Sequence, residues 1–124
     1  MNRSPRSEES RGPGESAEPP ADGTLGGYLR HHSRPPAFEG PDGYPYTVSM
    51  EIERTPNLRA PFSGYLIFPR WADNGTGILG HLETPLLFDG ESQDEVTAAL
   101  EALTIAEVNE LLGKAILRRQ RENE

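Results

Sequence analysis

The sequence predicts a small α+β domain, in which a mainly antiparallel sheet of three or four strands is followed by two helices packed on one of its faces. Two observations indicate the strands: side chains alternate between apolar and polar over residues 46–54, and a second apolar run covers residues 62–68. A third indicates the helices, because the apolar period changes from two to about 3.6 after Asp89 and Gly90. Strands that precede helices along a chain segregate from them, which defines this class.

The alternating segment, residues 46–54, predicts a half-buried antiparallel strand. Its apolar face consists of Tyr46, Val48, Met50 and Ile52. The next strand, residues 62–68, is apolar on both faces, so we expect it to be central or to be covered on its second face. Pro69 lacks an amide hydrogen, so pairing on one side should fail or bulge there. A glycine-containing turn leads to a third strand at 77–84, with Ile78 and Leu82 on one face. Residues 86–88 are expected to extend it as a short edge.

Two consecutive capping boxes predict the helices. In this motif a Ser or Thr and a Glu three residues later satisfy each other's free backbone amides. The pair Ser92 and Glu95 predicts a helix that starts at Ser92, and the pair Thr104 and Glu107 predicts a second helix that runs to about residue 119. Gly113 inside the second helix costs about 1 kcal/mol relative to Ala. We therefore expect a close packing contact at this glycine.

Proline and glycine are concentrated near the N-terminus, where the first 43 residues hold seven of the twelve prolines and seven of the thirteen glycines. Residues 1–23 are poor in large apolar side chains and are expected to form a disordered tail rich in Ser, Glu, Pro and Gly. Residues 24–43 are expected to be an irregular arm with one helical turn. A single α+β domain should span residues 44–119, and residues 120–124 should be a frayed C-terminus.

The chain carries a formal net charge of −8, and residues 44–124 contribute −6 of it. An acidic surface repels nucleic-acid phosphates, so general nucleic-acid binding is disfavoured. The chain has no cysteine, which excludes disulfides and thiolate metal sites and suits a reducing compartment. No apolar run approaches transmembrane length and the first residues do not resemble a secretory signal. We expect a cytoplasmic protein that does not bind membranes.

No nucleophile, metal or phosphate-binding motif is complete in this sequence, so no cofactor and no metal site are predicted. The candidate catalytic residues are His81, Glu83 and Asp73. His81 and Glu83 share one face of the third strand, and Asp73 lies in the preceding turn, so the three could form a general acid–base pair or metal ligands if they converge. The alternative interpretation is a solvent-facing polar strand surface.

The candidate partner-binding residues are Trp71, Arg70 and Tyr28. Trp, Tyr and Arg are the side chains favoured at interface hot spots. Trp71 and Arg70 lie at the end of the second strand, where the tryptophan could equally be a lid on the core. Tyr28 lies beside His31 and His32 in the arm, a segment that could equally be solvated.

These features favour a non-catalytic protein-interaction or regulatory module with an unidentified protein partner. The alternative is a small enzyme or ligand-binding domain that uses His81, Glu83 and Asp73. The second face of residues 62–68 also needs a cover, because two helices can cover only one face of the sheet. Either the apolar side chains of the arm, from Leu25 to Phe38, or a second copy in a symmetric homodimer could provide it.

Overall fold

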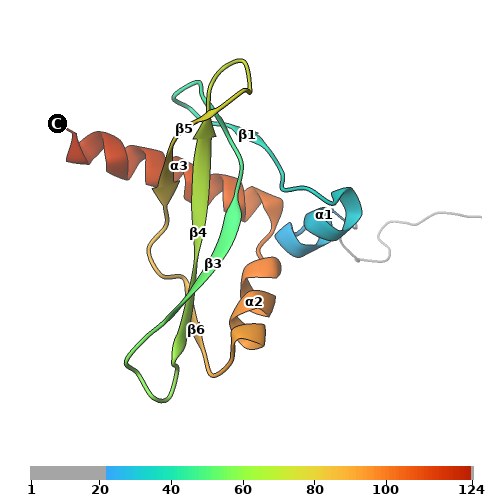
Figure 1. Cartoon of the computed structure of the whole chain (residues 1–124), viewed down its shortest axis with the longest axis vertical. Helices are drawn as coiled ribbons and strands as arrows, with labels where there is room; N and C mark the ends of the chain where they lie inside the picture. Colours follow the sequence, from blue (N-terminus) through green and yellow to red (C-terminus); the bar gives the residue numbers. More distant parts are fainter. Residues whose placement is uncertain (1–21, 124) are drawn as a thin grey trace, which may run out of the picture.

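A computed structural model describes residues 22–123 of the chain. Within these residues the elements follow in the order α1 (Leu25–His32), β1 (Phe38–Glu39), β2 (Pro45–Tyr46), β3 (Ser49–Arg54), β4 (Phe62–Trp71), β5 (Ile78–Glu83), β6 (Phe88–Gly90), α2 (Gln93–Glu101) and α3 (Ile105–Glu122). No described helix is long and apolar enough to cross a membrane. The α+β class and the antiparallel sheet are confirmed (Figure 1).

The ten-residue strand β4 is the centre of the sheet, as its two apolar faces predicted. Strands β2 and β3 pair with it along one side, and β5 and β6 pair with it along the other, all antiparallel. Strand β1 adds to the outside of β2. The described residues therefore form six strands, not three or four, because short strands of two or three residues carry too little alternation to be found in the sequence.

Strands β2 and β3 belong to one predicted strand, interrupted opposite a proline. Tyr46 pairs with Arg70 and Ser49 with Ile67, so the register is the same on both sides of the interruption. Between them the Thr47 amide donates to the Pro69 carbonyl at 3.2 Å, but Pro69 has no amide to donate in return. The predicted failure of pairing on one side of Pro69 is confirmed.

Strand β5 contains a bulge that changes which side chains are buried. Trp71 pairs with Ile78 and Arg70 with Gly80, which leaves Leu79 as an extra residue. Leu82 pairs with Phe68 and is buried, whereas Ile78 pairs with Trp71 and is 58% exposed. The expectation that Ile78 and Leu82 lie on one face was wrong, because the extra residue breaks the alternation between them.

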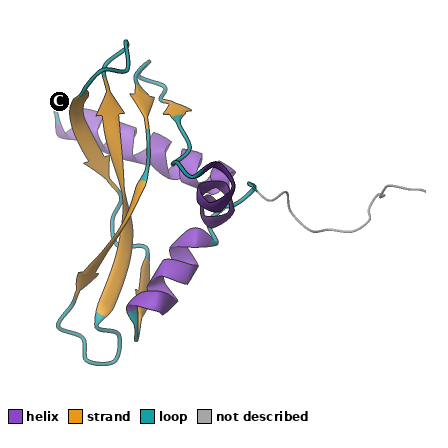
Figure 2. Ribbon diagram, turned by 45° about the vertical axis from the view of Figure 1, so that its right-hand side comes forward, coloured by secondary structure: helices purple, strands orange, loops and turns teal. Residues whose placement is uncertain are grey.

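All three helices lie on one side of the sheet (Figure 2). Helix α2 packs against β3, β4 and β6, and α3 packs against β5. The core between the layers is formed by Leu25, Tyr46, Val48, Leu66, Phe68, Leu82, Val96, Leu100, Val108, Leu112, Ala115 and Ile116. The side chains that β4 contributes to this core are the even-numbered Leu66 and Phe68. The odd-numbered side chains of this strand therefore face away from the helices.

Both predicted helix starts are correct, and one of the two capping boxes is complete. Thr104 and Glu107 accept hydrogen bonds from each other's backbone amides at the start of α3. At α2 the Ser92 hydroxyl accepts from the Glu95 amide, but the Glu95 carboxylate accepts from the amide of Glu91 instead of Ser92. The second half of that box is therefore displaced by one residue.

The N-terminal arm is more regular than expected, since it contains the two-turn helix α1 as well as β1. Its start is tied to the junction of α2 and α3: the Leu25 amide donates to Leu103, and the Ile105 amide donates to Gly23. Helix α1 contacts α2, so this part of the arm lies on the helix side of the sheet. The predicted disordered tail lies outside the described residues except for residues 22 and 23.

The expected packing contact at Gly113 was wrong. A methyl group added to this glycine would have no heavy-atom neighbour within 4 Å outside the adjacent helix backbone. Gly64 in β4 does need its small size, because an added methyl carbon would lie 2.5 Å from Val96. Helix α2 therefore approaches the sheet most closely over Gly64.

Candidate functional site

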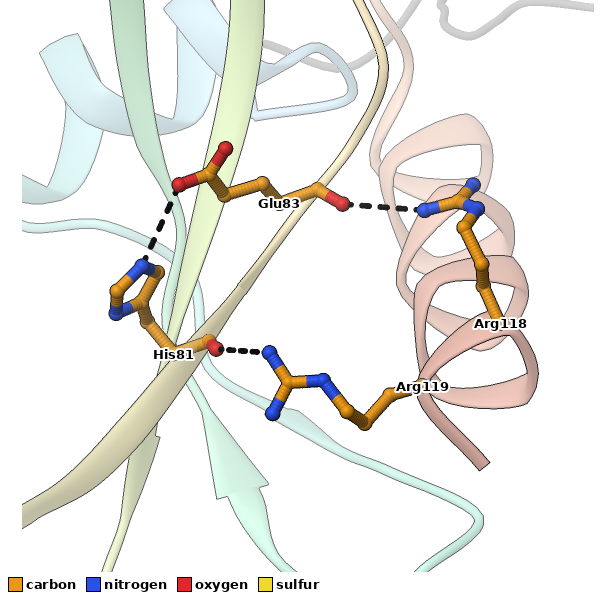
Figure 3. Close-up of polar contacts among 4 residues, drawn as sticks. All are labelled: His81, Glu83, Arg118 and Arg119. Carbon is orange, nitrogen blue, oxygen red and sulfur yellow. Dashed lines mark hydrogen bonds and ion pairs between the residues drawn. The ribbon is translucent and has the colours of Figure 1, made fainter. Parts of the chain in front are cut away.

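The predicted catalytic candidates lie on β5, beside the C-terminal half of α3. His81 and Glu83 have side chains that extend away from α3, and their carbonyl groups point toward it (Figure 3). Arg118 donates to the Glu83 carbonyl at 3.2 Å, and Arg119 donates to the His81 carbonyl at 3.4 Å. The two arginines thus occupy acceptors on the free edge of β5 and line a groove of about 210 Å³ between strand and helix.

His81 and Glu83 meet, but Asp73 does not line their groove. The His81 Nε2 and Glu83 Oε2 atoms are 3.4 Å apart, and both side chains are more than half exposed. Asp73 is exposed in the turn between β4 and β5. Across residues 22–123 no group of three His, Asp or Glu side chains could hold a metal ion. What the strand provides is a solvated imidazole–carboxylate pair.

The predicted partner-binding residues occupy three different environments. Trp71 lies at the end of β4, where its indole N–H donates to the Thr47 hydroxyl at 3.0 Å. It is absent from the core cluster, so it is not a lid on that core. Arg70 lies over the ring of Tyr44, 4.7 Å from its centroid. Tyr28 lies on α1 against the ring of His32.

Beneath Arg70 lies a buried tyrosine that the sequence had indicated only as a core residue. The Tyr46 hydroxyl donates to the Asp42 carboxylate at 2.6 Å. Burial, with help from this hydrogen bond and the Asp42 charge, raises the pKa of Tyr46 to about 12, although the Arg70 guanidinium acts in the opposite direction. This contact fixes the loop between β1 and β2 to the core and is structural.

The sequence predicted a second apolar face on residues 62–68 but not the residues around it. This is the outer face of the sheet, on the side away from the helices. Its centre is an apolar row along β4, which we call the outer row. The outer row consists of Tyr65, Ile67, Pro69 and Trp71. All four are partly exposed, and none belongs to the core or packs against it. The signal was the run over residues 62–68 that is apolar on both faces, which predicted a second apolar face in need of a cover.

Carboxylates surround the outer row on both sides. Glu51 lies opposite Tyr65, Glu53 opposite Ser63, Glu83 opposite Ile67 and Asp89 opposite Ser63. Burial and the charges of Glu83, Glu53 and Glu51 raise the pKa of Tyr65, which places its hydroxyl in a negative potential. None of the outward positions of β3, β4, β5 and β6 holds Lys or Arg. The outer face therefore combines an apolar centre with an acidic border.

Comparison with known proteins assigns no role to this surface. The chain matches no protein-family model, and no curated protein and no solved structure is significantly similar to it.

Proposed function

We propose that the protein is a non-catalytic interaction module that binds a protein partner through the outer face of its sheet. The observation that carries this proposal is the outer row. In an antiparallel sheet with one solvated face, the outward residues are normally polar. Strand β3 follows that rule with Glu51 and Glu53, and β5 follows it at His81 and Glu83 but not at Ile78, which pairs with Trp71. Strand β4 places two aromatic side chains, Ile67 and Pro69 between them.

The chemistry of the face indicates the kind of partner. Aromatic side chains at the centre of a surface and a charged rim around them are the usual anatomy of an interface. Here the rim is acidic, and complementary charge increases both the association rate and the specificity. The partner surface should therefore be apolar at its centre and basic at its border.

A second copy of the chain suits this face less well than a basic partner. Two identical outer faces pressed together would bring eight carboxylates, four from each copy, around one interface at neutral pH. Like charges across an interface cost free energy unless cations or protons neutralise them. A homodimer through the outer face would therefore have to form most readily at low pH and high salt.

The proposal is tested by quantitative affinity capture from native host extract, with the double variant Tyr65→Thr, Ile67→Thr beside the unaltered protein. Threonine keeps the strand preference but removes most apolar surface. The matched control is Leu58→Thr, because Leu58 is 94% exposed in the β3–β4 turn and away from the face. The double variant should lose specific partners that the control retains. If the captured set is the same for all three proteins, the outer face is not the binding surface.

The contact between His81 and Glu83 favours a second candidate, a small enzyme or ligand-binding domain that uses this pair of side chains. An imidazole next to a carboxylate is a pair that general acid–base catalysis uses. Against this candidate, both side chains are mostly solvated and Asp73 does not line the groove. If His81→Ala abolishes an activity or a ligand-induced rise in melting temperature, and Glu110→Ala does not, this candidate replaces the first.

A further inference from the structure

Within residues 22–123, strand β3 is an edge strand whose outward backbone groups have no hydrogen-bond partner. The Thr47 amide donates to the Pro69 carbonyl, and the Thr55 amide donates to the Pro61 carbonyl. In this register the backbone amides and carbonyls of the odd-numbered residues of β3 point toward β4. The amides and carbonyls of Met50 and Ile52 therefore point away from the sheet. Among the described residues, no hydrogen bond is made by these backbone groups.

The other long edge of the sheet is occupied. Strand β5 has the same length as β3, but Arg118 and Arg119 of α3 donate to its outward carbonyls (Figure 3). Strand β2 is covered by β1. A row of unpaired N–H and C=O groups is a template for another strand, and proteins usually cover or interrupt such an edge. Strand β3 is the six-residue edge left open in the described part of the chain (Figure 1).

The side chains beside this open edge alternate in chemistry. On the outer face, Glu51 and Glu53 carry carboxylates. On the inner face, Met50 and Ile52 are partly buried and pack against the core. A strand added to the edge would place every second side chain beside the carboxylates and the others beside the apolar pair. The edge therefore matches a strand in which basic and apolar residues alternate.

We propose that β3 binds an extended basic segment of the partner by antiparallel strand addition, with Lys or Arg beside Glu51 and Glu53 and apolar residues beside Met50 and Ile52. This inference rests on the proposed function and names the form of the partner. Backbone hydrogen bonds would supply affinity, and the alternating side chains would supply specificity. The net charge of −8 would attract such a segment at a distance.

The same carboxylates disfavour pairing of two β3 edges. If two copies paired in an antiparallel way about Ile52, Glu51 of one copy would lie opposite Glu53 of the other, and the reverse pair would form as well. Like charges directly opposite each other are destabilising in a sheet. The edge thus discriminates against its own copy and in favour of a basic strand.

The test uses a ten-residue probe peptide of alternating lysine and valine, measured by fluorescence anisotropy against the full chain. In the proposed pairing the valines lie opposite Met50 and Ile52 and exchange hydrogen bonds with them, while the lysine amides point to solvent. A peptide N-methylated at its valines should bind at least tenfold more weakly than one N-methylated at its lysines. Comparable affinities of these two peptides, which have the same charge, would overturn the proposal.

A variant pair tests the same pairing from the protein side. Glu51→Lys, Glu53→Lys should weaken binding of the unmethylated peptide at least tenfold. Glu91→Lys, Glu110→Lys changes the net charge equally at exposed positions away from the edge and should have an effect of threefold or less. Equal effects of the two double variants would reduce the interaction to general charge attraction and contradict the edge site. Their melting temperatures are compared first to verify that both are folded.

A hydrogen-exchange measurement separates this inference from the proposed function. On peptide binding, the amides of Met50 and Ile52 should become protected from exchange, and those of Glu91 and Glu110 should not. If no protection appears while host partners still depend on Tyr65 and Ile67, the edge proposal fails and the face proposal stands. If protection appears while captured partners ignore Tyr65 and Ile67, the face proposal fails instead.

Discussion

The closest approach between helix and sheet can be tested by adding one methyl group to β4, with Gly64→Ala. The added carbon would lie 2.5 Å from Val96 Cγ1 and 2.9 Å from Leu100 Cδ1, where about 3.4–4 Å is ordinary contact. Both neighbours are buried, with 1% and 0% of their surface exposed, so neither can turn into solvent. The methyl group must therefore displace α2 from the sheet.

The expected cost follows from two opposing effects. Overpacking of a close-packed core costs about 1–3 kcal/mol. Replacing glycine by alanine in a strand recovers about 0.5–1 kcal/mol, because alanine loses less backbone freedom on folding. Gly64→Ala should therefore lower the free energy of unfolding by about 1–2 kcal/mol. For a domain of this size the melting temperature should fall by roughly 10 °C.

Urea unfolding followed by circular dichroism measures this cost, with Gly113→Ala as the comparison. An added methyl at Gly113 meets no atom outside its own helix within 4 Å, so this variant should gain up to about 1 kcal/mol. A Val96→Ala background removes the shorter of the two contacts and leaves the one with Leu100, so Gly64→Ala should cost less there than in the unaltered protein. If Gly64→Ala is as stable as the unaltered protein, α2 does not pack over β4 as closely as described.

Three further predictions concern stability. Leu112→Ala should cost about 2–5 kcal/mol in urea unfolding and Leu111→Ala clearly less, because Leu112 is 1% exposed while Leu111 is only partly buried; equal effects would contradict this orientation of α3. The raised pKa of Tyr46 means that folding retains its proton, so the stabilisation is complete below pH 10 and is lost between pH 10 and 12. Across that window the unaltered protein should lose on the order of 2–3 kcal/mol more than Tyr46→Phe, and parallel curves would refute the assignment. Deletion of residues 1–21, which lack large apolar side chains beyond Met1, should leave the melting temperature unchanged in calorimetry, whereas a clear decrease would mean that the segment packs on the domain.

Local signals in the sequence determined where the main elements begin and which face of each is apolar. Ser92 and Thr104 mark the two helix starts because a cap needs only its own side chain and amides two or three residues away. The alternation from Tyr46 to Ile52 identifies the buried face of one strand, since side chains in a strand alternate by geometry alone. Pro69 predicts the break in pairing because it has no amide hydrogen in any context.

Other features depended on contacts between distant segments, and no local pattern contains those. Leu111 and Leu112 fit the apolar stripe of α3 equally well, and the position of the helix on the sheet decides that Leu112 is the buried one. The role of Gly64 depends on α2, which is formed by residues about thirty positions later.

The candidate site divides in the same way. The sequence alone indicated that residues 62–68 have a second apolar face and that His81 and Glu83 share a side of their strand. The register of β3, β4 and β5 decided that Glu51 and Glu83 border Tyr65 and Ile67. Among the described residues, the packing of α3 decided that its arginines occupy the edge of β5 while the edge of β3 stays open. Each residue type determines the chemistry of its own side chain. The surface that these side chains form together exists only after strands far apart in the chain have paired.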